Sequence, residues 1–440
     1  MKTDFQEIVN YVIQFLLGNG NPELVNFIGY TSDKEKYKYF KIVIYPSGFF
    51  DEDIYLSEKS LPELPLQRWE DLPLLFGKPE IQKTGDTTVI YTDIIAGTYF
   101  LISRYEEVVR RDVRDEHGRF RGKYSLPFRA GFLNRPIVEE YGRMLRKLLR
   151  ESGIEVAEPK EGFNSIYLTH DADQIAHYRN FRGMAGAVTR FFTKPYQTYK
   201  ALQTYFLGIE NDPWFTFPWF FDLAFELKKF IPYTSLESIV FVKTGGGELM
   251  TDKPIHDIQS KDFRKLFTLC EENNVSIGLH PSYQAGLDKG LIVVEKKLLD
   301  EAFGQSSVYT RNHFLRSREP EDFHALLEAG LNEDFTMGYA DVAGFRLGTC
   351  RTVRWIDPVK MELTSLVLHP ITIMDSTLDD ERYMKLRTEE AFSFSKKLID
   401  QVRKFNGDLV LLWHNTSVEK NNGKYHRDLY RWIINYLKKR

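Results

Sequence analysis

Residues 168–174 read Leu-Thr-His-Asp-Ala-Asp-Gln and continue an apolar run that begins at Ile166. A buried strand that ends at a polar site has this pattern. Side chains alternate in direction along a strand, so Asp171 and Asp173 are expected to lean to the same side. Neighbouring carboxylates repel each other, and both stay ionised only if a cation or hydrogen-bond donors offset the repulsion. The pair therefore indicates a divalent metal beside a proton-accepting carboxylate; the alternative is that Asp173 caps a helix.

The composition limits the class of protein. A chain of 440 residues is expected to divide into two domains, and its 42% hydrophobic and 14% aromatic residues are enough to form sizeable cores. The 59 Lys and Arg nearly balance the 62 Asp and Glu, so the overall charge gives no electrostatic footprint for nucleic acid or for an anionic membrane surface. We find neither a secretion signal nor an apolar stretch long enough for a membrane span. Together with the low count of two cysteines, this predicts a cytoplasmic protein without a disulfide framework.

The first third of the chain alternates short strands and helices. Residues 38–45 and 88–95 are rich in β-branched and aromatic residues and are predicted strands, and residues 96–112 are predicted to be helical. Residues 115–119 are interpreted as a solvated turn. The polar stretch 152–162 predicts a boundary between an N-terminal α/β domain of undefined role, residues 1–160, and a second domain, residues 161–440.

In the second domain, predicted strands separated by helices end in chemically useful side chains. This order is typical of parallel sheets and of (β/α) barrels, in which the carboxyl ends of the strands share one face and carry the active site. The side chains expected there are Asp171, Asp173, His280, Arg346, Asp375 and His414.

Two histidines are candidate metal ligands. His280 follows the apolar strand 275–279, where an imidazole can project into a site, although a lone histidine is also commonly structural. His313 lies in the stretch 311–316, Arg-Asn-His-Phe-Leu-Arg. We interpret this stretch as a second ligand flanked by anion-binding arginines, with a solvated loop as the alternative.

The remaining candidates concern proton transfer. Arg346 lies in an apolar run and needs a carboxylate partner, for which Asp171 is the candidate. His414 ends the strand 409–413, where it could donate a proton to a leaving group or be a satisfied core histidine. Asp375, at the end of another apolar run, could orient His414 or raise its basicity.

The order of these motifs resembles the polysaccharide deacetylase (NodB-like) superfamily, carbohydrate esterase family four, from about residue 166 to the carboxyl terminus. The whole chain looks like a bacterial subgroup with an added N-terminal α/β domain. The resemblance implies a distorted, TIM-like, seven-stranded (β/α) barrel. It also implies Asp171 as general base, Arg346 as the residue that holds it, and His414 as general acid with Asp375 as its partner. Asp173 and His280 are the implied metal ligands.

The sequence departs from this family at two motifs. The second motif normally has another histidine four residues after the first, but Gln284 occupies that position, so His313 is our candidate replacement. The third motif normally continues with Pro-Tyr, whose tyrosine amide helps to hold the oxyanion. Here Gly348 and Thr349 stand in those places. We therefore expect an altered metal and oxyanion site.

The resemblance implies a hydrolase that removes an N-acetyl group from a saccharide or a glycan precursor. The implied cofactor is a divalent metal, with Zn²⁺ favoured by mixed His and Asp ligands and Co²⁺, Ni²⁺ or Fe²⁺ as alternatives. Two other hypotheses are a hydrolase of another non-peptide C–N bond and a catalytically inactive, glycan-binding or scaffold barrel. The sequence defines neither the sugar nor the oligomeric state.

Overall fold

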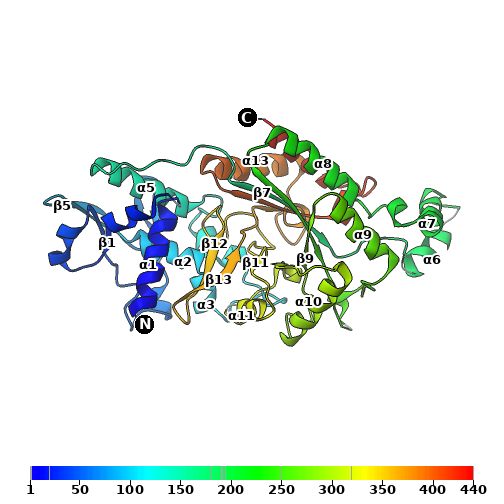
Figure 1. The fold of residues 1–440 in the computed structure, drawn as a ribbon, viewed down its shortest axis with the longest axis horizontal. Helices are drawn as coiled ribbons and strands as arrows, with labels where there is room; N and C mark the ends of the chain where they lie inside the picture. The colour runs from blue at the N-terminus through cyan, green and yellow to red at the C-terminus, as the bar shows by residue number, and fades with distance from the viewer. Residues whose placement is uncertain are drawn as a thin grey trace.

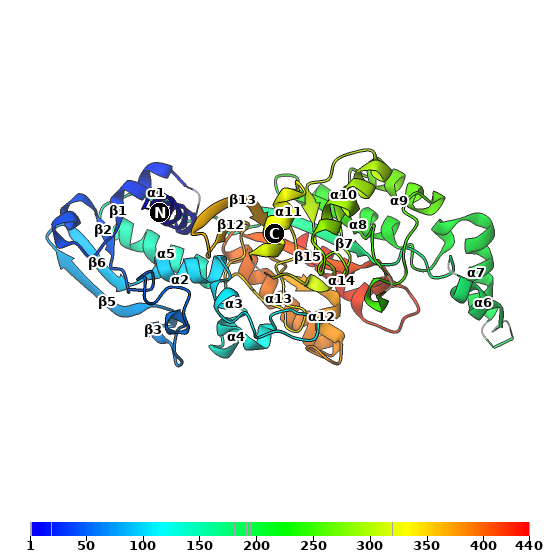
Figure 2. The same cartoon turned by 90° about the horizontal axis from the view of Figure 1, so that it is seen from below.

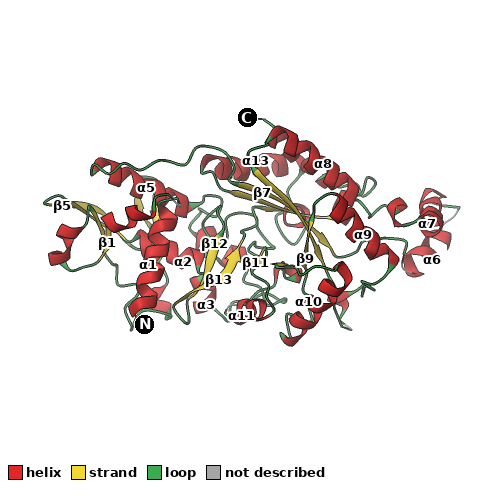
Figure 3. Ribbon diagram, viewed as in Figure 1, coloured by secondary structure: helices red, strands yellow, loops and turns green. Residues whose placement is uncertain are grey.

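The computed structural model describes residues 2–18, 20–179, 181–189, 192–193, 195–247, 249–318 and 320–439. It is a mixed α/β structure with two main sheets (Figures 1 and 3). The first is four-stranded, in the order β1 (Ile28–Tyr30), β2 (Ile42–Ile44), β6 (Thr87–Thr92), β5 (Gly77–Thr84). Strands β1, β2 and β6 are parallel, and β5 is antiparallel to β6. The predicted strands near residues 38–45 and 88–95 correspond to β2 and β6.

Three helices accompany this sheet: α1 (Lys2–Leu16), α2 (Ile94–Ile102) and α5 (Ile137–Glu151). All residues of α2 are buried, which fits its uniformly apolar sequence. The predicted helix over residues 96–112 is divided, because Arg104 adopts a left-handed conformation (φ 59°) between α2 and α3 (Tyr105–Val109). This break turns the chain from the first sheet towards the second.

The second sheet contains nine strands in the order β12-β13-β11-β10-β9-β8-β7-β15-β14. Neighbours are parallel except for the antiparallel pair β12–β13. In chain order the strands are β7 (Ser165–Ala172), β8 (Ser235–Val242), β9 (Ser276–Leu279), β10 (Tyr309–Thr310), β11 (Glu333–Asp334), β12 (Val353–Asp357), β13 (Glu362–Leu368), β14 (Ile373–Met374) and β15 (Asp408–His414). The helices between and after them include α8 (Phe217–Phe230), α9 (Lys261–Glu272), α10 (Gly290–Phe303), α11 (Glu321–Glu328), α13 (Thr388–Lys404) and α14 (His426–Leu437).

Both faces of this sheet are buried, because alternate side chains enter two different cores. Ile166 and Leu168 of β7 belong to the large core that includes the helices, whereas Tyr167 packs against a smaller core with Val410 and Leu412. The ring of Tyr167 lies 5.3 Å from that of Phe335, next to β11, although three strands separate β7 from β11. The sheet must therefore curl, so that strands distant in its order face each other across the smaller core.

The strand pairing does not close into a complete ring. Within the described residues the ladders end at β14 on one side and at β12 on the other. A single backbone hydrogen bond, from Ile371 N to Met337 O at 2.9 Å, joins the segment before β14 to the segment after β11. The predicted barrel is thus observed as a curled, mostly parallel sheet.

The N-terminal part contacts the larger sheet through the segment that follows α2. Gly122 donates its backbone N–H to Asp341 Oδ1 at 2.7 Å, and Arg119 Nη1 donates to the carbonyl of Phe314 at 3.2 Å. The two parts therefore share a packed, hydrogen-bonded contact (Figure 2). Across the described chain, we find no helix with the length and apolar character needed to cross a bilayer.

Candidate active site

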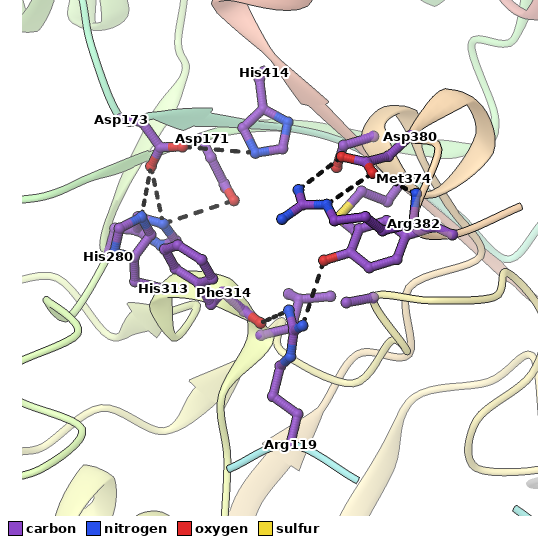
Figure 4. Close-up of a pocket in the computed structure, with 14 residues that line it drawn as sticks. Arg119, Asp171, Asp173, His280, His313, Phe314, Met374, Asp380, Arg382 and His414 are labelled. Atoms are coloured by element: carbon purple, nitrogen blue, oxygen red, sulfur yellow. Dashed lines mark hydrogen bonds and ion pairs between the residues drawn. The ribbon is translucent and has the colours of Figure 1, made fainter. Parts of the chain in front are cut away.

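A pocket of about 180 Å³ opens at the carboxyl ends of the strands of the larger sheet. Its lining combines acidic, imidazole and guanidinium groups from segments far apart in the sequence (Figure 4). The polar lining residues are Arg119, Asp171, Asp173, His280, His313, Ser376, Asp380, Arg382, Tyr383 and His414. The strand ends thus meet at one face, as expected for parallel strands.

Asp171 is fixed by Arg311. The Asp171 side chain is buried near the end of β7, and its Oδ1 accepts a hydrogen bond from Arg311 Nη1 at 2.7 Å. Arg311 is itself fully buried and held on all sides: Nη2 donates to Thr169 Oγ1 at 2.6 Å, and Nε donates to the carbonyl of Phe335 at 3.0 Å. The Phe241 ring lies 4.3 Å from the guanidinium carbon. Because the guanidinium cannot turn away, it holds the Asp171 carboxylate in one orientation.

The prediction that Arg346 pairs with Asp171 is wrong, because Arg346 makes a different ion pair. Arg346 Nε and Nη2 bind Glu107 Oε1 and Oε2 at 3.0 and 2.8 Å, and Nη1 donates to the carbonyl of Gly338 at 2.7 Å. Burial alone would raise the pKa of Glu107, but Arg104 and Arg346 hold it at about 2. Arg346 does need a carboxylate, as predicted, and finds it in α3 instead of β7. It therefore joins the two parts of the chain and lies outside the pocket lining.

Asp173, His280 and His313 form a cluster of potential metal ligands. One donor atom of each lies within 4.8 Å of those of the other two. Asp173 Oδ1 is 3.3 Å from His280 Nε2 and 3.5 Å from His313 Nε2 (Figure 4). One carboxylate oxygen and two imidazole nitrogens are the kind of donor set that binds Zn²⁺ and leaves a position for water or substrate.

Groups behind the two histidines direct the Nε2 atoms towards Asp173. His280 Nδ1 lies 2.5 Å from the carbonyl of Arg311, which can only accept, so Nδ1 carries a proton and Nε2 is the ring nitrogen that faces Asp173. His313 Nδ1 lies 3.6 Å from Asp252 Oδ1, so Asp252 favours the same tautomer there. Outer partners of this kind commonly orient metal-bound histidines.

The electrostatics of Asp173 fit a cation. Its Oδ1 is buried and has no hydrogen-bond partner among the described residues. Burial opposes ionisation, but the neighbouring imidazoles of His280, His313 and His414 hold the pKa of Asp173 well below its usual range. A buried, ionised oxygen without a donor is costly, and a bound cation would remove that cost. The residues present therefore fit a divalent metal.

His414 lies across the pocket from this cluster. It ends β15, and its Nδ1 is 2.8 Å from Asp375 Oδ1, while its backbone N–H donates to Asp375 Oδ2 at 2.8 Å. Nε2 therefore faces the pocket and lies 3.8 Å from Asp173 Oδ2. Burial would lower the pKa of His414, but Asp375, with help from Asp173 and Asp171, raises it to about 10. The imidazole is thus a cation at neutral pH, able to give a proton to a group in the pocket.

The two departures from the family pattern have clear positions. Gln284 donates its backbone N–H to Asp252 Oδ2 at 3.0 Å, so its position supports the residue behind His313. Thr349 Oγ1 binds Glu139 of α5, and the carbonyl of Gly348 accepts the N–H of Val138. The segment that continues from Arg346 therefore packs against the N-terminal part and supplies no residue to the pocket lining.

The pocket also contains residues that sequence reasoning missed. The Asp115 to Arg119 turn, interpreted above as solvated, is half-buried: Glu116 is exposed, but Arg119 is buried, binds Asp115 Oδ2 at 2.8 Å and reaches Tyr383 Oη at 3.4 Å. Arg119 and Arg382 lie on the side of the pocket opposite the Asp173 cluster (Figure 4). In the sequence, only the two clusters of histidine and arginine, residues 115–119 and 311–316, indicated that these arginines could line a site. Asp252 gave no local signal.

A family model and solved structures are similar to parts of this chain. A family of unknown function, DUF7033, matches residues 2–153. No curated protein matches the chain significantly. A crystal structure of a "putative polysaccharide deacetylase" from Mycobacterium smegmatis superposes with a TM-score of 0.40 and 15% identity, covering 65% of this chain and 89% of that one. An allantoinase, PuuE, superposes with a TM-score of 0.37 and 10% identity, covering 63% and 84%.

Proposed function

We propose that this chain is a metal-dependent hydrolase that removes an N-acetyl group from a saccharide. One observation carries the proposal: two carboxylates two residues apart have different partners. Asp171 is bound by Arg311, whereas Asp173 faces His280 and His313. A turn with only a structural role does not require its two carboxylates to have different partners, whereas a general base beside a metal ligand does.

The metal would be held by Asp173, His280 and His313. The mixed oxygen and nitrogen donors favour Zn²⁺, with Co²⁺, Ni²⁺ and Fe²⁺ as alternatives. When bound, the cation supplies Lewis acidity, which polarises the amide carbonyl and lowers the pKa of water.

The proton transfers belong to the protein side chains. Asp171, oriented by Arg311, accepts a proton from the water that attacks the acetamide carbonyl carbon. His414 then donates its Nε2 proton to the amide nitrogen as the C–N bond breaks, while its Nδ1 proton stays on the ring in the hydrogen bond to Asp375. The products are acetate and a free amino sugar. General acid and base groups of this kind contribute about 10²–10⁴-fold each to the rate.

The proposal includes a finer description of the architecture. Residues 161–440 would form a distorted barrel from the seven strands β7, β8, β9, β10, β11, β14 and β15, preceded by a separate N-terminal α/β domain of residues 1–160. The contact between Tyr167 and Phe335 and the hydrogen bond between Ile371 and Met337 support the barrel. The end of the DUF7033 match at residue 153 supports the domain boundary.

Acetate release from N-acetylated oligosaccharides tests the function. Purified protein loaded with Zn²⁺ should release acetate, and Asp171→Asn should abolish release while retaining the metal. Acetate release at an undiminished rate by Asp171→Asn would contradict the assignment of the base.

A parallel panel of linear and cyclic amides that lack a sugar is the substrate control. Turnover of these amides with no acetate release from any N-acetyl sugar would replace the saccharide with another C–N substrate. Asp222→Asn, on the exposed surface of α8, is the control for a neutral change at an aspartate.

A further inference from the structure

Residues 174–209, between β7 and α8, form a projection that the proposed chemistry does not use. It contains α6 (Phe181–Thr189) and α7 (Pro195–Leu207), and we call it the α6–α7 hairpin. The hairpin extends from the end of the molecule opposite the N-terminal sheet (Figures 1 and 2). It packs on itself through small side chains, including a hydrogen bond from Thr198 Oγ1 to the carbonyl of Ala187.

Helix α7 buries its small residues and exposes its large apolar ones. Thr198, Ala201 and Thr204 are buried. The exposed residues and their exposed fractions are Tyr196 57%, Tyr199 56%, Leu202 42%, Tyr205 61%, Phe206 74% and Leu207 68%, joined by Phe192 at 94% in the preceding loop. A helix that packs only against its own protein shows the reverse pattern. A concentration of exposed aromatic residues on one projecting element indicates an interaction surface.

The charge of the hairpin identifies the kind of surface it fits. Its 36 residues contain five Lys and Arg (Arg179, Arg182, Arg190, Lys194 and Lys200) and no Asp or Glu, whereas the whole chain has 59 basic and 62 acidic residues. Basic groups with exposed tyrosine, phenylalanine and leucine suit the interface of an anionic bilayer, where rings lie at headgroup level and cations meet lipid phosphates. We propose that the α6–α7 hairpin docks this protein on an anionic membrane surface.

The base of the hairpin is tied to the rim of the pocket. Asn415, next to His414, donates from Nδ2 to the carbonyls of Gln174, at 2.8 Å, and Trp214, at 2.7 Å. Asp212 accepts the backbone N–H groups of His177 and Tyr178 at 2.8 and 2.9 Å. Since Gln174 directly follows Asp173, the base of the hairpin begins one residue from the pocket lining.

A second copy of this chain is a poorer occupant of the same surface. In a twofold dimer the hairpin would meet its own copy and bring together two segments of the same net positive charge, even with Arg179 paired to Asp262 at 2.9 Å. An anionic lipid surface offers the opposite charge to the segment.

Sedimentation of the full chain with vesicles tests the proposal. We expect binding to vesicles of phosphatidylglycerol and phosphatidylcholine in a 3:7 ratio, at least tenfold weaker binding to pure phosphatidylcholine, and weakening by added salt. The variant with Tyr205→Ser, Phe206→Ser and Leu207→Ser should bind at least tenfold more weakly, and Lys200→Glu should be weaker than the parent. The control, Phe225→Ser with Tyr233→Ser, removes exposed rings of 65% and 99% exposure outside the hairpin and should bind like the parent.

Three results would overturn membrane docking: no vesicle binding by the parent chain, equal binding to neutral and anionic vesicles, or equal losses in the hairpin and control variants. Light scattering could give a fourth result that overturns it. If the parent chain is a dimer that dissociates in the triple serine variant, and no vesicle binding is seen, the surface serves self-association. Circular dichroism establishes whether each variant is folded. If the triple serine variant does not fold, Lys200→Glu, which changes only a charge, still tests the proposal.

Discussion

Arg311 Nη1 and Asp171 Oδ1 lie 2.7 Å apart, although 140 residues separate them in the chain. The carbonyl of the same Arg311 lies 2.5 Å from His280 Nδ1. One residue therefore fixes both the proposed base, through its side chain, and a proposed metal ligand, through its backbone. Substitution of Arg311 removes its side chain but keeps its backbone carbonyl. It should therefore affect Asp171 and leave the contact with His280 in place.

Replacement of Arg311 by methionine should leave Asp171 as a buried, unpaired carboxylate. We expect the free energy of unfolding to fall by about 3–5 kcal/mol, the usual cost of breaking a buried ion pair. Acetate release should fall by at least about 100-fold, in the range expected for losing a general base. Urea unfolding and acetate release, measured on folded protein, check both effects. Full activity in Arg311→Met would show that Asp171 does not depend on its partner.

Arg346→Met is the matched control, because Arg346 is equally buried and also pairs with one carboxylate, Glu107. It should destabilise the fold by less than Arg311→Met does, because Glu107 keeps its ion pair with Arg104. Since Arg346 lies outside the pocket lining, Zn²⁺ affinity and kcat per folded molecule should stay close to those of the parent. A specific loss of kcat in Arg346→Met, greater than that of Arg311→Met, would restore Arg346 to the role inferred from sequence.

His313 should be required for metal binding, and Gln284 should not. Isothermal titration with Zn²⁺ should show a large loss of affinity in His313→Ala, because one of three protein ligands is removed. Asp252→Asn should weaken Zn²⁺ binding by about 10–100-fold, as other outer partners of metal-bound histidines do. Gln284→Ala should match the parent, since Gln284 contacts Asp252 through its backbone. The reverse ranking of Gln284 and His313 would contradict the cluster.

Loss of His414 should depend on the leaving group. His414→Asn should lower kcat by about 10²–10⁴-fold on an N-acetyl sugar, the contribution typical of a general acid. The loss should be much smaller on an acetylated aryl amine whose departing nitrogen needs less protonation. Asp375→Asn should show the same pattern more weakly, because Asp375 accepts the hydrogen bond from protonated His414 Nδ1. Equal losses on both substrates would argue that His414 supports the structure without donating the proton.

His170 should make the protein sensitive to acid. Burial, with the Phe220 ring 3.9 Å away, lowers the pKa of His170 to about 3 from an ordinary 6.5. The unfolded chain then binds a proton that the folded chain does not, so stability is full above about pH 6.5 and falls towards pH 3. The slope for one proton is about 1.4 kcal/mol per pH unit.

His170→Gln should flatten the acid side of the stability profile by about that slope. Chemical denaturation at several pH values between about 4 and 7 measures the difference. An unchanged slope in this variant would show that His170 does not titrate on unfolding.

The parts of the site that follow the strand pattern could be predicted from the sequence. Asp171, Asp173, His280 and His414 end apolar runs, so their shared position follows from parallel strands. The partners of buried charges could not be predicted. Arg311 and Arg346 both need a carboxylate, and nothing in the neighbouring sequence shows which carboxylate each one binds. Tertiary packing brings Arg311, which follows β10, to Asp171, and brings Arg346 to Glu107.

The barrel was also only partly predictable. Strands β10, β11 and β14 have two residues each, too few for a periodicity that would mark them in the sequence. The turn at residues 115–119 resembled solvated loops because its cover comes from distant residues, Phe314 and Tyr383.

The metal centre is the central claim, and anomalous diffraction at the zinc edge from crystals grown with Zn²⁺ tests it most directly. We expect one anomalous peak in the pocket, about 2.0–2.3 Å from an oxygen of Asp173 and from Nε2 of both His280 and His313. The peak should be absent in His313→Ala crystals and present in Asp171→Asn crystals. A pocket without an anomalous peak at saturating Zn²⁺, or a peak that lacks contacts to these three residues, would contradict the account.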